Sequence, residues 1–354
     1  MPTTNTVEKE LAKGAGLSII GLVDCLVEHA NEVRASDIHI DPLADKVRIR
    51  FRIDGVLQDV FSLPKNIHAE VISRIKILAR LRTDEHNATQ DGRLRHELPS
   101  GNHVDIRVSI VPTYHGENSV LRLLSDKAEN FDLNSLGFSA SDKEKIVTAL
   151  KKPNGMILST GPTGSGKTTT LYTMIKMLNS PEVSIITIED PIEYAISDIE
   201  QIQVNPRTGL TFANGLRSIL RQDPNIIMVG EIRDAETANI AVNTALTGHL
   251  LLSTLHTNDA ATTLPRLLDM GIETYLVAST VNIIIGQRLI RKVCDHCKEE
   301  IPVDASVKEG LKNNELLGLL NNVKHLYRGK GCKKCNESGY AGRICINEVL
   351  VADD

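Results

Sequence analysis

The residues from Gly161 to Thr168 have the types and spacing needed to bind phosphate. They match G-x-x-x-x-G-K-[ST] at every fixed position, and the glycines leave backbone N–H groups free to point at an anion. Lys167 can reach the outer phosphates of a nucleotide, and the Thr168 hydroxyl suits Mg²⁺. The stretch therefore predicts a nucleoside-triphosphate site, with an ordinary glycine turn between a strand and a helix as the alternative. The expected nucleotide contacts are Gly161, Pro162, Thr163, Gly164, Ser165, Gly166, Lys167, Thr168 and Thr169.

Acidic residues follow two apolar stretches that read as buried strands. Glu189, Asp190 and Glu193 follow the first stretch, and Glu231 follows the second. Transfer of a phosphoryl group to water needs a base or a water-positioning group and a metal ligand, and acids at strand ends can supply both. At the place of Glu231 in phosphate-loop sites an Asp is commoner than a Glu. We therefore expect Glu231 to contact Mg²⁺ either directly or through a metal-bound water. The alternative for all four acids is capping of a helix N-terminus.

Two histidines, His249 and His256, bracket a third apolar stretch. An imidazole at a strand end beside the phosphate loop could sense or contact a γ-phosphate. The alternative is a polar side chain satisfied by its neighbours.

Four of the six cysteines form two C-x-x-C pairs, Cys294 with Cys297 and Cys332 with Cys335. Two such knuckles offer four soft ligands, which predicts a closed, tetrahedral and structural Zn²⁺ site. Such a site can contribute on the order of 10 kcal/mol to the folding of a small subdomain. A redox dithiol is the alternative, because each C-x-x-C alone would permit it.

The composition sets limits on the class of protein. The chain has 354 residues, 45 acidic against 40 basic, no tryptophan and 3% aromatic residues. A mild negative charge and few stacking side chains argue against nucleic-acid binding by bulk electrostatics. No apolar run reaches the roughly 18 residues that span a bilayer, and the first residues do not resemble a signal peptide. We therefore expect a cytoplasmic protein with more than one domain.

Residues 17–125 mix helical and strand patterns, which predicts an α+β domain. Helical spacing covers 17–34, and alternation over 47–53 predicts a strand with arginines on one face. That face reads as solvated surface, with a partner contact as the alternative. Tight turns are expected at Asp54-Gly55 and at Asp91-Gly92.

Two arginines are expected to face each other near the end of this domain. The alternating pattern of a hairpin surrounds a loop at 112–118, and a symmetric loop would place Arg107 opposite Arg122. Like charges that face each other are unfavourable, so an unpaired couple of arginines predicts an anion or an acidic partner.

From residue 156 the sequence alternates apolar strands with helical segments, the pattern of a parallel sheet covered by helices. Strands are expected at 156–159, 185–188, 226–229 and 250–254, and helices at 141–150, 167–179, 212–221, 235–246 and 260–270. A polar stretch precedes this region and marks a linker. The expected division is an N-terminal domain at 1–125, a linker at 126–137, a core at 138–290 and a zinc subdomain at 291–354.

Together these residues resemble the ATPases of type II secretion and type IV pilus assembly, from about residue 35 to about residue 351. The shared marks are Ala35-Ser-Asp-Ile-His39-Ile, Arg50-Phe-Arg52-Ile-Asp54-Gly, Gln90-Asp-Gly-Arg93, the phosphate loop, the box from Glu189 to Glu193, Gly230-Glu231-Ile-Arg233-Asp and the box from His249 to His256. The resemblance implies an α/β fold. Its core would be a RecA-like P-loop NTPase with a parallel-rich sheet, between a smaller α+β, PAS-like domain and the zinc subdomain.

The resemblance also implies roles for particular residues. Glu193 would be the general base, Glu231 the Walker B acid and His256 a γ-phosphate contact. Arg107 and Arg122 would be the arginines that the N-terminal domain places on phosphate, so that domain closure could switch hydrolysis on and off.

The partners implied are a homo-hexamer and the cytoplasmic part of an inner-membrane platform protein, with no direct nucleic acid. ATP, Mg²⁺ and Zn²⁺ are the expected cofactors, and the protein would lie at the inner face of the membrane through its partners. Retraction motors of the family lack the four cysteines, which favours pilus extension or secretion. The rivals are a competence-type DNA-handling ATPase and a nucleotide-gated scaffold with little turnover. From where the match begins and ends, the family's N-terminal docking domain and helical C-terminal tail are expected to be absent.

Overall fold

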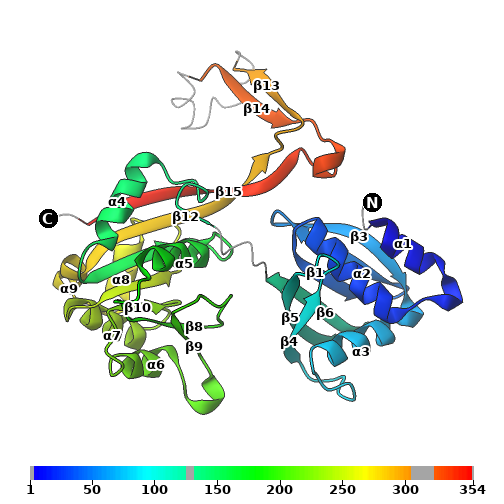
Figure 1. The fold of residues 1–354 in the computed structure, drawn as a ribbon, viewed down its shortest axis with the longest axis horizontal. Helices are drawn as coiled ribbons and strands as arrows, with labels where there is room; N and C mark the ends of the chain where they lie inside the picture. The colour runs from blue at the N-terminus through cyan, green and yellow to red at the C-terminus, as the bar shows by residue number, and fades with distance from the viewer. Residues whose placement is uncertain (1–3, 125–130, 304–322, 353–354) are drawn as a thin grey trace. The chain divides into compact units, whose positions relative to one another are not determined.

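The computed structural model describes residues 4–124, 131–303 and 323–352, and the chain forms two compact units, Met1–Lys127 and Ala128–Asp354 (Figure 1). Residues 126–130 of the predicted linker and 304–322 of the predicted zinc subdomain lie outside the described residues. Each unit is built around one large sheet.

The first unit is a six-stranded antiparallel sheet in the order β3-β2-β1-β6-β5-β4. Alternate strand residues such as Ile38, Ile49 and Ile106 are buried against apolar residues of α2 and α3. Because side chains alternate along a strand, the residues between them face the other side, and many of those are arginines. The elements are α1 (Thr4–Ala12), η1 (Gly14–Gly16), α2 (Ile19–Glu32), β1 (Ala35–Pro42), β2 (Lys46–Ile53), β3 (Val56–Pro64), η2 (Lys65–Ile67), α3 (His68–Leu78), β4 (Gln90–Glu97), β5 (His103–Thr113) and β6 (Gly116–Leu124).

The local predictions for this unit are mostly confirmed. The helix at 17–34 is α2, whose N-terminus is capped by the Ser18 hydroxyl accepting the N–H of Gly21. The strand at 47–53 is β2. Asp54 and Gly55 join β2 to β3 with φ values of 49° and 86°, the left-handed pair that a two-residue hairpin requires.

Two predicted loops are wrong. Asp91 and Gly92 lie inside β4 and form no turn. The glycine is needed there because a Cβ at Gly92 would lie 2.8 Å from the carbonyl oxygen of Ala79. The loop predicted at 112–118 is too long, because β5 and β6 both extend into it.

The second unit contains a seven-stranded sheet in the order β15-β12-β7-β11-β10-β8-β9. Its strands are parallel except for β15, which runs antiparallel to β12. The elements are α4 (Ala140–Leu150), β7 (Gly155–Thr160), α5 (Lys167–Leu178), β8 (Ile185–Glu189), β9 (Glu200–Gln203), η4 (Pro206–Thr208), α6 (Phe212–Ile219), β10 (Ile226–Val229), α7 (Ala235–Leu246), β11 (Leu250–Leu255), α8 (Thr263–Asp269), α9 (Thr274–Thr280), β12 (Val281–Val293), β13 (Lys298–Pro302), β14 (His325–Gly329), η6 (Lys333–Cys335) and β15 (Tyr340–Val351).

Helices cover both faces of this sheet. One core cluster joins α4 and α5 to the sheet, and another joins α6, α7, α8 and α9 to it. The central strands β7, β8, β10 and β11 are consequently buried at every residue. Burial on two sides explains their continuous apolar runs, and the four strands predicted from those runs are confirmed.

The predicted helices are confirmed as α4, α5, α6 and α7, whereas the helix expected at 260–270 is the shorter α8. The long strands β12 and β15 pair along the hairpin that leads from the sheet to the small β13–β14 sheet (Figure 1). Because β7, β11, β10 and β8 are parallel, their carboxyl ends lie at one edge of the sheet, where the predicted nucleotide site would be.

Candidate nucleotide and metal sites

The predicted phosphate loop connects β7 to α5, with Gly161 to Gly166 in the loop and Lys167 to Thr169 in the first helical turn. Gly161 has a φ of 138°, and a Cβ there would lie 2.3 Å from the carbonyl oxygen of Gln287. Gly166 precedes α5 with a φ of 94°, so the first N–H groups of the helix open toward the loop. The backbone has the form that phosphate binding needs.

Two side chains of the loop also fit an anion. Lys167 is nearly buried, and its Nζ donates to the carbonyl oxygens of Gly161 at 2.8 Å and Pro162 at 3.1 Å. Burial lowers the pKa of Lys167, while the negative charge of Glu231 opposes the shift. The buried hydroxyl of Ser165 has no hydrogen-bond partner among the described residues. A phosphate would give both groups a strong acceptor.

Glu231 lies just beyond β10, and its Oε2 atom is close to two side chains. It is 2.6 Å from Nε of Arg233 and 3.1 Å from Nε2 of His256, which follows β11. The parallel pairing of β10 with β11 therefore brings together two of the predicted site residues. His249 lies at the other end of β11, with Nδ1 3.3 Å from the carbonyl oxygen of Thr244, so its surroundings match the structural alternative.

Glu189 ends β8 in a buried hydrogen-bond network that includes the backbone of Glu193. Its carboxylate accepts from the hydroxyl of Tyr172, from Thr187 at 2.6 Å and from Gln201 at 3.1 Å. Burial raises the pKa of Glu189, although these hydrogen bonds oppose the rise. The capping alternative is wrong for Glu189, because its partners are side chains of α5, β8 and β9. The backbone N–H of Glu193 donates to the same Tyr172 hydroxyl at 3.3 Å.

Gln287 of β12 is a buried polar residue that was not predicted to matter. Its Oε1 accepts from the Ser159 hydroxyl at 2.8 Å, and its Nε2 donates to Thr170 at 2.9 Å and to Asn347 at 3.0 Å. These bonds join β7, α5, β12 and β15 beside the phosphate loop. The strands β12 and β15, which lead toward the cysteines, are thus linked by hydrogen bonds to α5, the helix that begins at Lys167.

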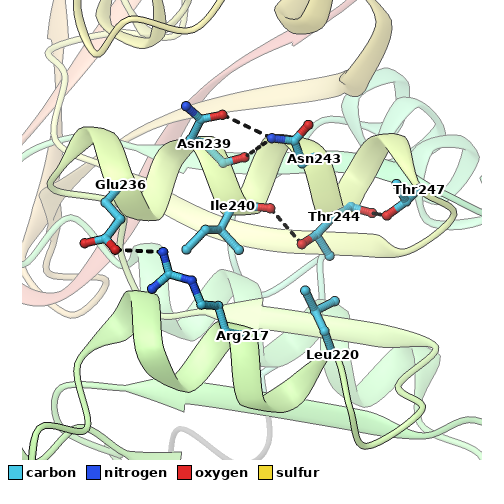
Figure 2. A pocket seen from close by; sticks show the side chains of 8 residues that line it. All are labelled: Arg217, Leu220, Glu236, Asn239, Ile240, Asn243, Thr244 and Thr247. Atoms are coloured by element: carbon cyan, nitrogen blue, oxygen red, sulfur yellow. Dashed lines mark hydrogen bonds and ion pairs between the residues drawn. The ribbon is translucent and has the colours of Figure 1, made fainter.

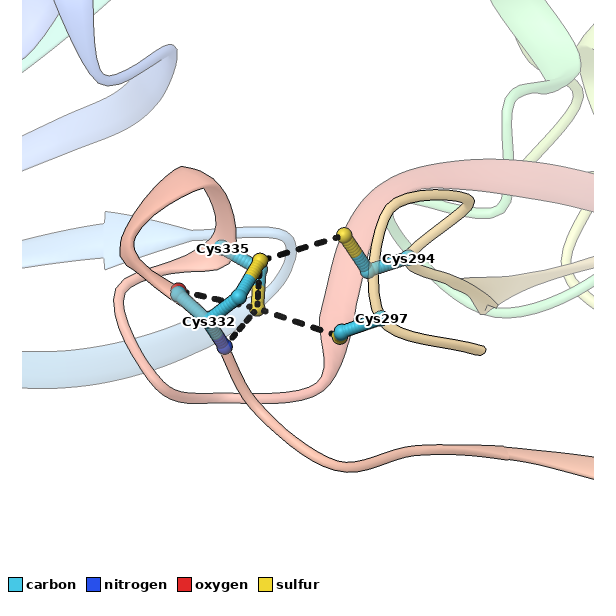
Figure 3. A group of neighbouring side chains, drawn as sticks. All are labelled: Cys294, Cys297, Cys332 and Cys335. Atoms are coloured by element: carbon cyan, nitrogen blue, oxygen red, sulfur yellow. Dashed lines mark hydrogen bonds between the residues drawn. The ribbon is translucent and has the colours of Figure 1, made fainter. Parts of the chain in front are cut away.

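The Sγ atoms of the four predicted zinc ligands all lie within 4.8 Å of one another (Figure 3). The separations are 4.0 Å from Cys294 to Cys332, 3.8 Å from Cys297 to Cys335 and 3.7 Å from Cys332 to Cys335. Zn–S bonds of about 2.3 Å in a tetrahedron require sulfur atoms about 3.8 Å apart. A disulfide would require about 2.05 Å. The four cysteines therefore fit one Zn²⁺ ion.

Backbone groups further support this cluster of sulfurs. The N–H groups of Cys332 and Gly339 donate to Sγ of Cys335 at 3.2 Å and 3.3 Å. Such bonds orient a thiolate and stabilise its charge before the metal binds.

A row of charged residues crosses the first unit's sheet on the face opposite the helices. Arg107 lies opposite Arg122, as predicted, and the row continues to Arg93 on β4 and Asp37 on β1. Nε of Arg122 donates to Oδ1 of Asp37 at 2.9 Å. The expectation of an unpaired couple is therefore wrong, because the sequence pattern could not show that β1 lies beside β6.

A surface pocket of about 470 Å³ lies between α6 and α7, away from the phosphate loop (Figure 2). Its polar side chains have partners in the pocket wall: Arg217 lies 2.7 Å from Glu236, and Asn243 donates to Asn239 at 3.1 Å. The hydroxyls of Thr244 and Thr247 donate to backbone carbonyl oxygens. Nothing on these walls indicates a ligand.

The structure brings together most of the predicted site residues of the second unit. The phosphate loop, Glu231 and His256 lie at one edge of the sheet, and Glu193 is linked to α5 through Tyr172. Three residues with clear supporting contacts, Tyr172, Gln201 and Gln287, were missed. Their only sequence signal is a polar residue beside a buried segment, which is too common to single them out.

A family model described as "Type II/IV secretion system protein" matches residues 13–354. The chain belongs to this family. This secretion-family chain is 47% identical over 336 residues to the Type II secretion system ATPase E of Vibrio cholerae. The match covers 95% of this chain and 66% of that relative. The chain is 45% identical over 345 residues to the Type IV pilus assembly ATPase PilB of Myxococcus xanthus, covering 96% and 60%. The chain thus spans less than two thirds of the length of these curated relatives, 66% of one and 60% of the other.

Solved structures agree with the fold of this secretion-family chain. The pilus retraction motor PilT, solved with bound ADP, is 26% identical with a TM-score of 0.61, over 93% of this chain and 82% of that one. The Legionella pneumophila ATPase DotB, 24% identical with a TM-score of 0.67 over 94% and 80%, shows likeness of fold alone. The predicted α/β fold with a parallel-rich sheet and the predicted family are confirmed. Among the described residues, no helix has the length and apolar character to cross a membrane.

Proposed function

We propose that this chain is the motor of a type II secretion or type IV pilus assembly system and hydrolyses ATP with Mg²⁺. The observation that carries the proposal is the gathering of the phosphate loop, Glu231 and His256 at the carboxyl edge of one parallel sheet. Backbone N–H groups that cradle an anion, beside an acid from a neighbouring strand, are what phosphoryl transfer uses.

Each residue of the site has its own proposed role in hydrolysis. Lys167 and the loop N–H groups bind the phosphates, and the Thr168 hydroxyl holds Mg²⁺. Glu231 binds the metal directly or through its water. Glu193 accepts a proton from the attacking water, and His256 contacts the γ-phosphate. The contacts of Lys167, Glu193 and Glu231 in the structure support these roles.

Arg107 and Arg122 are proposed to bind phosphate, the role that the family resemblance implies for them. Their position in one cross-strand row gives two adjacent guanidinium groups on an open sheet face. The bond from Arg122 to Asp37 holds one of them in place until an anion competes for it. Arginines in such roles accelerate phosphoryl transfer by roughly 10³–10⁵-fold.

The assembly proposed is a homo-hexamer that works on the cytoplasmic part of an inner-membrane platform protein. The chain would then lie in the cytoplasm at the inner face of the membrane, held there by its partners. The curated relatives named for secretion and for pilus assembly are about equally similar, so both systems are kept in the proposal. The four cysteines hold a structural Zn²⁺ in the part of the chain that follows β12.

Two rivals make different predictions. A DNA-handling ATPase would bind DNA tightly and with a steep salt dependence, which a net charge of −5 and an aromatic content of 3% do not favour. A nucleotide-gated scaffold would bind ATP without useful turnover. Filter binding with duplex DNA over a range of salt addresses the first rival, and phosphate release addresses the second.

The test of the proposal compares Lys167→Ala with Lys151→Ala, an exposed lysine that follows α4. The wild type and the Lys151 variant should release phosphate from ATP only when Mg²⁺ is present. The Lys167 variant should lose nucleotide binding and turnover together. Nucleotide binding by the wild type with no phosphate release would support the scaffold and contradict the motor.

A further inference from the structure

The segment between β8 and β9 carries Glu193, and side chains of α5 and β9 form hydrogen bonds with its backbone. The N–H of Glu193 donates to the Tyr172 hydroxyl at 3.3 Å. The carbonyl oxygen of Tyr194 accepts from Nε2 of Gln201 at 3.2 Å, and the N–H of Ile196 donates to Oε1 of Gln201 at 2.8 Å. A connection without regular structure would otherwise hold a catalytic side chain loosely.

Tyr172 links this segment to the phosphate loop. It lies on α5, the helix whose first residue is Lys167, and its side chain is fully buried. Its hydroxyl donates to Glu189 and accepts from Glu193 and from Gln201, the latter at 3.4 Å. A single hydroxyl therefore connects the helix that would hold the phosphates to the segment that would hold the base.

The buried acid Glu189 fixes the direction of that hydroxyl. Because the Tyr172 hydroxyl donates its hydrogen bond to this carboxylate, the lone pairs of the hydroxyl oxygen can accept from the N–H groups of Glu193 and Gln201. The ring of Tyr194 packs edge-on against the ring of Tyr172, with 4.7 Å between the ring centroids. This contact restrains the ring that carries the hydroxyl. The whole arrangement is buried or half-buried, where each hydrogen bond is hard to replace by water.

We propose that Tyr172 and Gln201 are positioning residues for Glu193, which set the place of its carboxylate relative to the nucleotide held by α5. The inference rests on the proposed function, because it needs Glu193 to act as the base. Neither positioning residue belongs to the phosphate loop, because Tyr172 lies further along α5 and Gln201 lies in β9. Loss of either one should therefore lower kcat and leave nucleotide affinity unchanged.

The variants for the test are Tyr172→Phe, which removes only the hydroxyl, and Gln201→Met, which keeps the length of the side chain. Tyr275→Phe is the matched control, because Tyr275 is exposed on α9. Each variant is measured for ATP-dependent phosphate release and for Kd of an ATP analogue. A small displacement of a catalytic group costs up to about 10²-fold in rate, so we expect kcat to fall about 10- to 100-fold with KM and Kd unchanged.

The decisive step repeats Tyr172→Phe in the Glu193→Gln background. If Tyr172 acts through Glu193, the residual rate of the Glu193→Gln chain should change by less than about twofold when the hydroxyl is removed. An equal loss in both backgrounds, an unchanged kcat in the single variants, or a loss explained by weaker nucleotide binding would overturn the inference. A Glu193→Gln chain as active as the wild type would instead overturn the proposed role of Glu193 as the base, on which the inference rests.

Discussion

Nε2 of His256 lies 3.1 Å from Oε2 of Glu231, across the ends of the neighbouring parallel strands β11 and β10. The same carboxylate oxygen lies 2.6 Å from Nε of Arg233. An acid held by two partners has a fixed direction, and the imidazole is held at the same edge of the sheet as the phosphate loop. The two residues are therefore expected to act as one unit on the bound nucleotide.

Replacement of His256 by Ala should lower kcat on the order of 10²-fold, the cost of removing one group aimed at the charge of a transition state. His249 at the opposite end of β11 provides the control, because its ring contacts a backbone carbonyl oxygen away from that edge. Phosphate release is measured for both variants. Equal losses for His256→Ala and His249→Ala would contradict a specific role for His256.

The four cysteines predict about one Zn²⁺ per chain after purification without chelator. Cys332→Ser removes one of four ligands and should abolish most of this content and lower the Tm of the second unit. Cys25→Ser on α2 serves as the control, because Cys25 lies outside the cluster. Metal analysis that finds less than about half an equivalent in the wild type would count against the four-thiolate site.

The buried Glu189 predicts a pH dependence of stability. Burial raises its pKa in the folded protein above the ordinary value of 4.5. The folded state then binds the proton more tightly than the unfolded state, so the stability contributed by Glu189 is full below about pH 4.5 and is lost as the pH rises through the folded pKa.

Thermal unfolding of wild type and Glu189→Gln between about pH 4 and about pH 8 isolates this contribution, because the other titrating groups cancel in the difference. The Tm of the wild type relative to the variant should fall as the pH rises. A difference that stays constant or rises across the range would show that burial does not raise the pKa of Glu189.

The row of arginines predicts that Arg122→Gln lowers turnover by roughly 10³-fold or more if Arg122 binds phosphate. Arg95→Gln is the matched control, because Arg95 shares the sheet face and also binds a carboxylate, that of Asp105 at 2.7 Å, but lies outside the row of Arg93, Arg107 and Arg122. Steady-state phosphate release by the two variants checks the prediction. The assignment of Arg122 to phosphate would fail if both variants kept the wild-type rate.

The parts of this chain that follow local patterns could be predicted from the sequence. The phosphate loop is a contiguous motif, and the strands β7, β8, β10 and β11 are apolar because both of their faces are buried. The zinc cluster was predictable because two knuckles supply all of its ligands.

The remaining features depend on contacts between distant residues. Gln287 meets Ser159 across 128 positions, and Arg122 meets Asp37 across 85, so no local spacing records either contact. The edge strand β9 is Glu-Gln-Ile-Gln, which lacks an apolar pattern, and it was therefore missed. The assignment of Glu193 as base came from the family resemblance, and the network around Tyr172 became visible only once β8, β9 and α5 were placed together.

Single-turnover hydrolysis of ATP by the wild type and by Glu193→Gln tests the central claim most directly, with nucleotide Kd measured on the same samples. Loss of a general base typically costs about 10²–10⁴-fold, so the account predicts a fall of that size in the rate of phosphate formation with an unchanged Kd. Equal rates in the two proteins would contradict it.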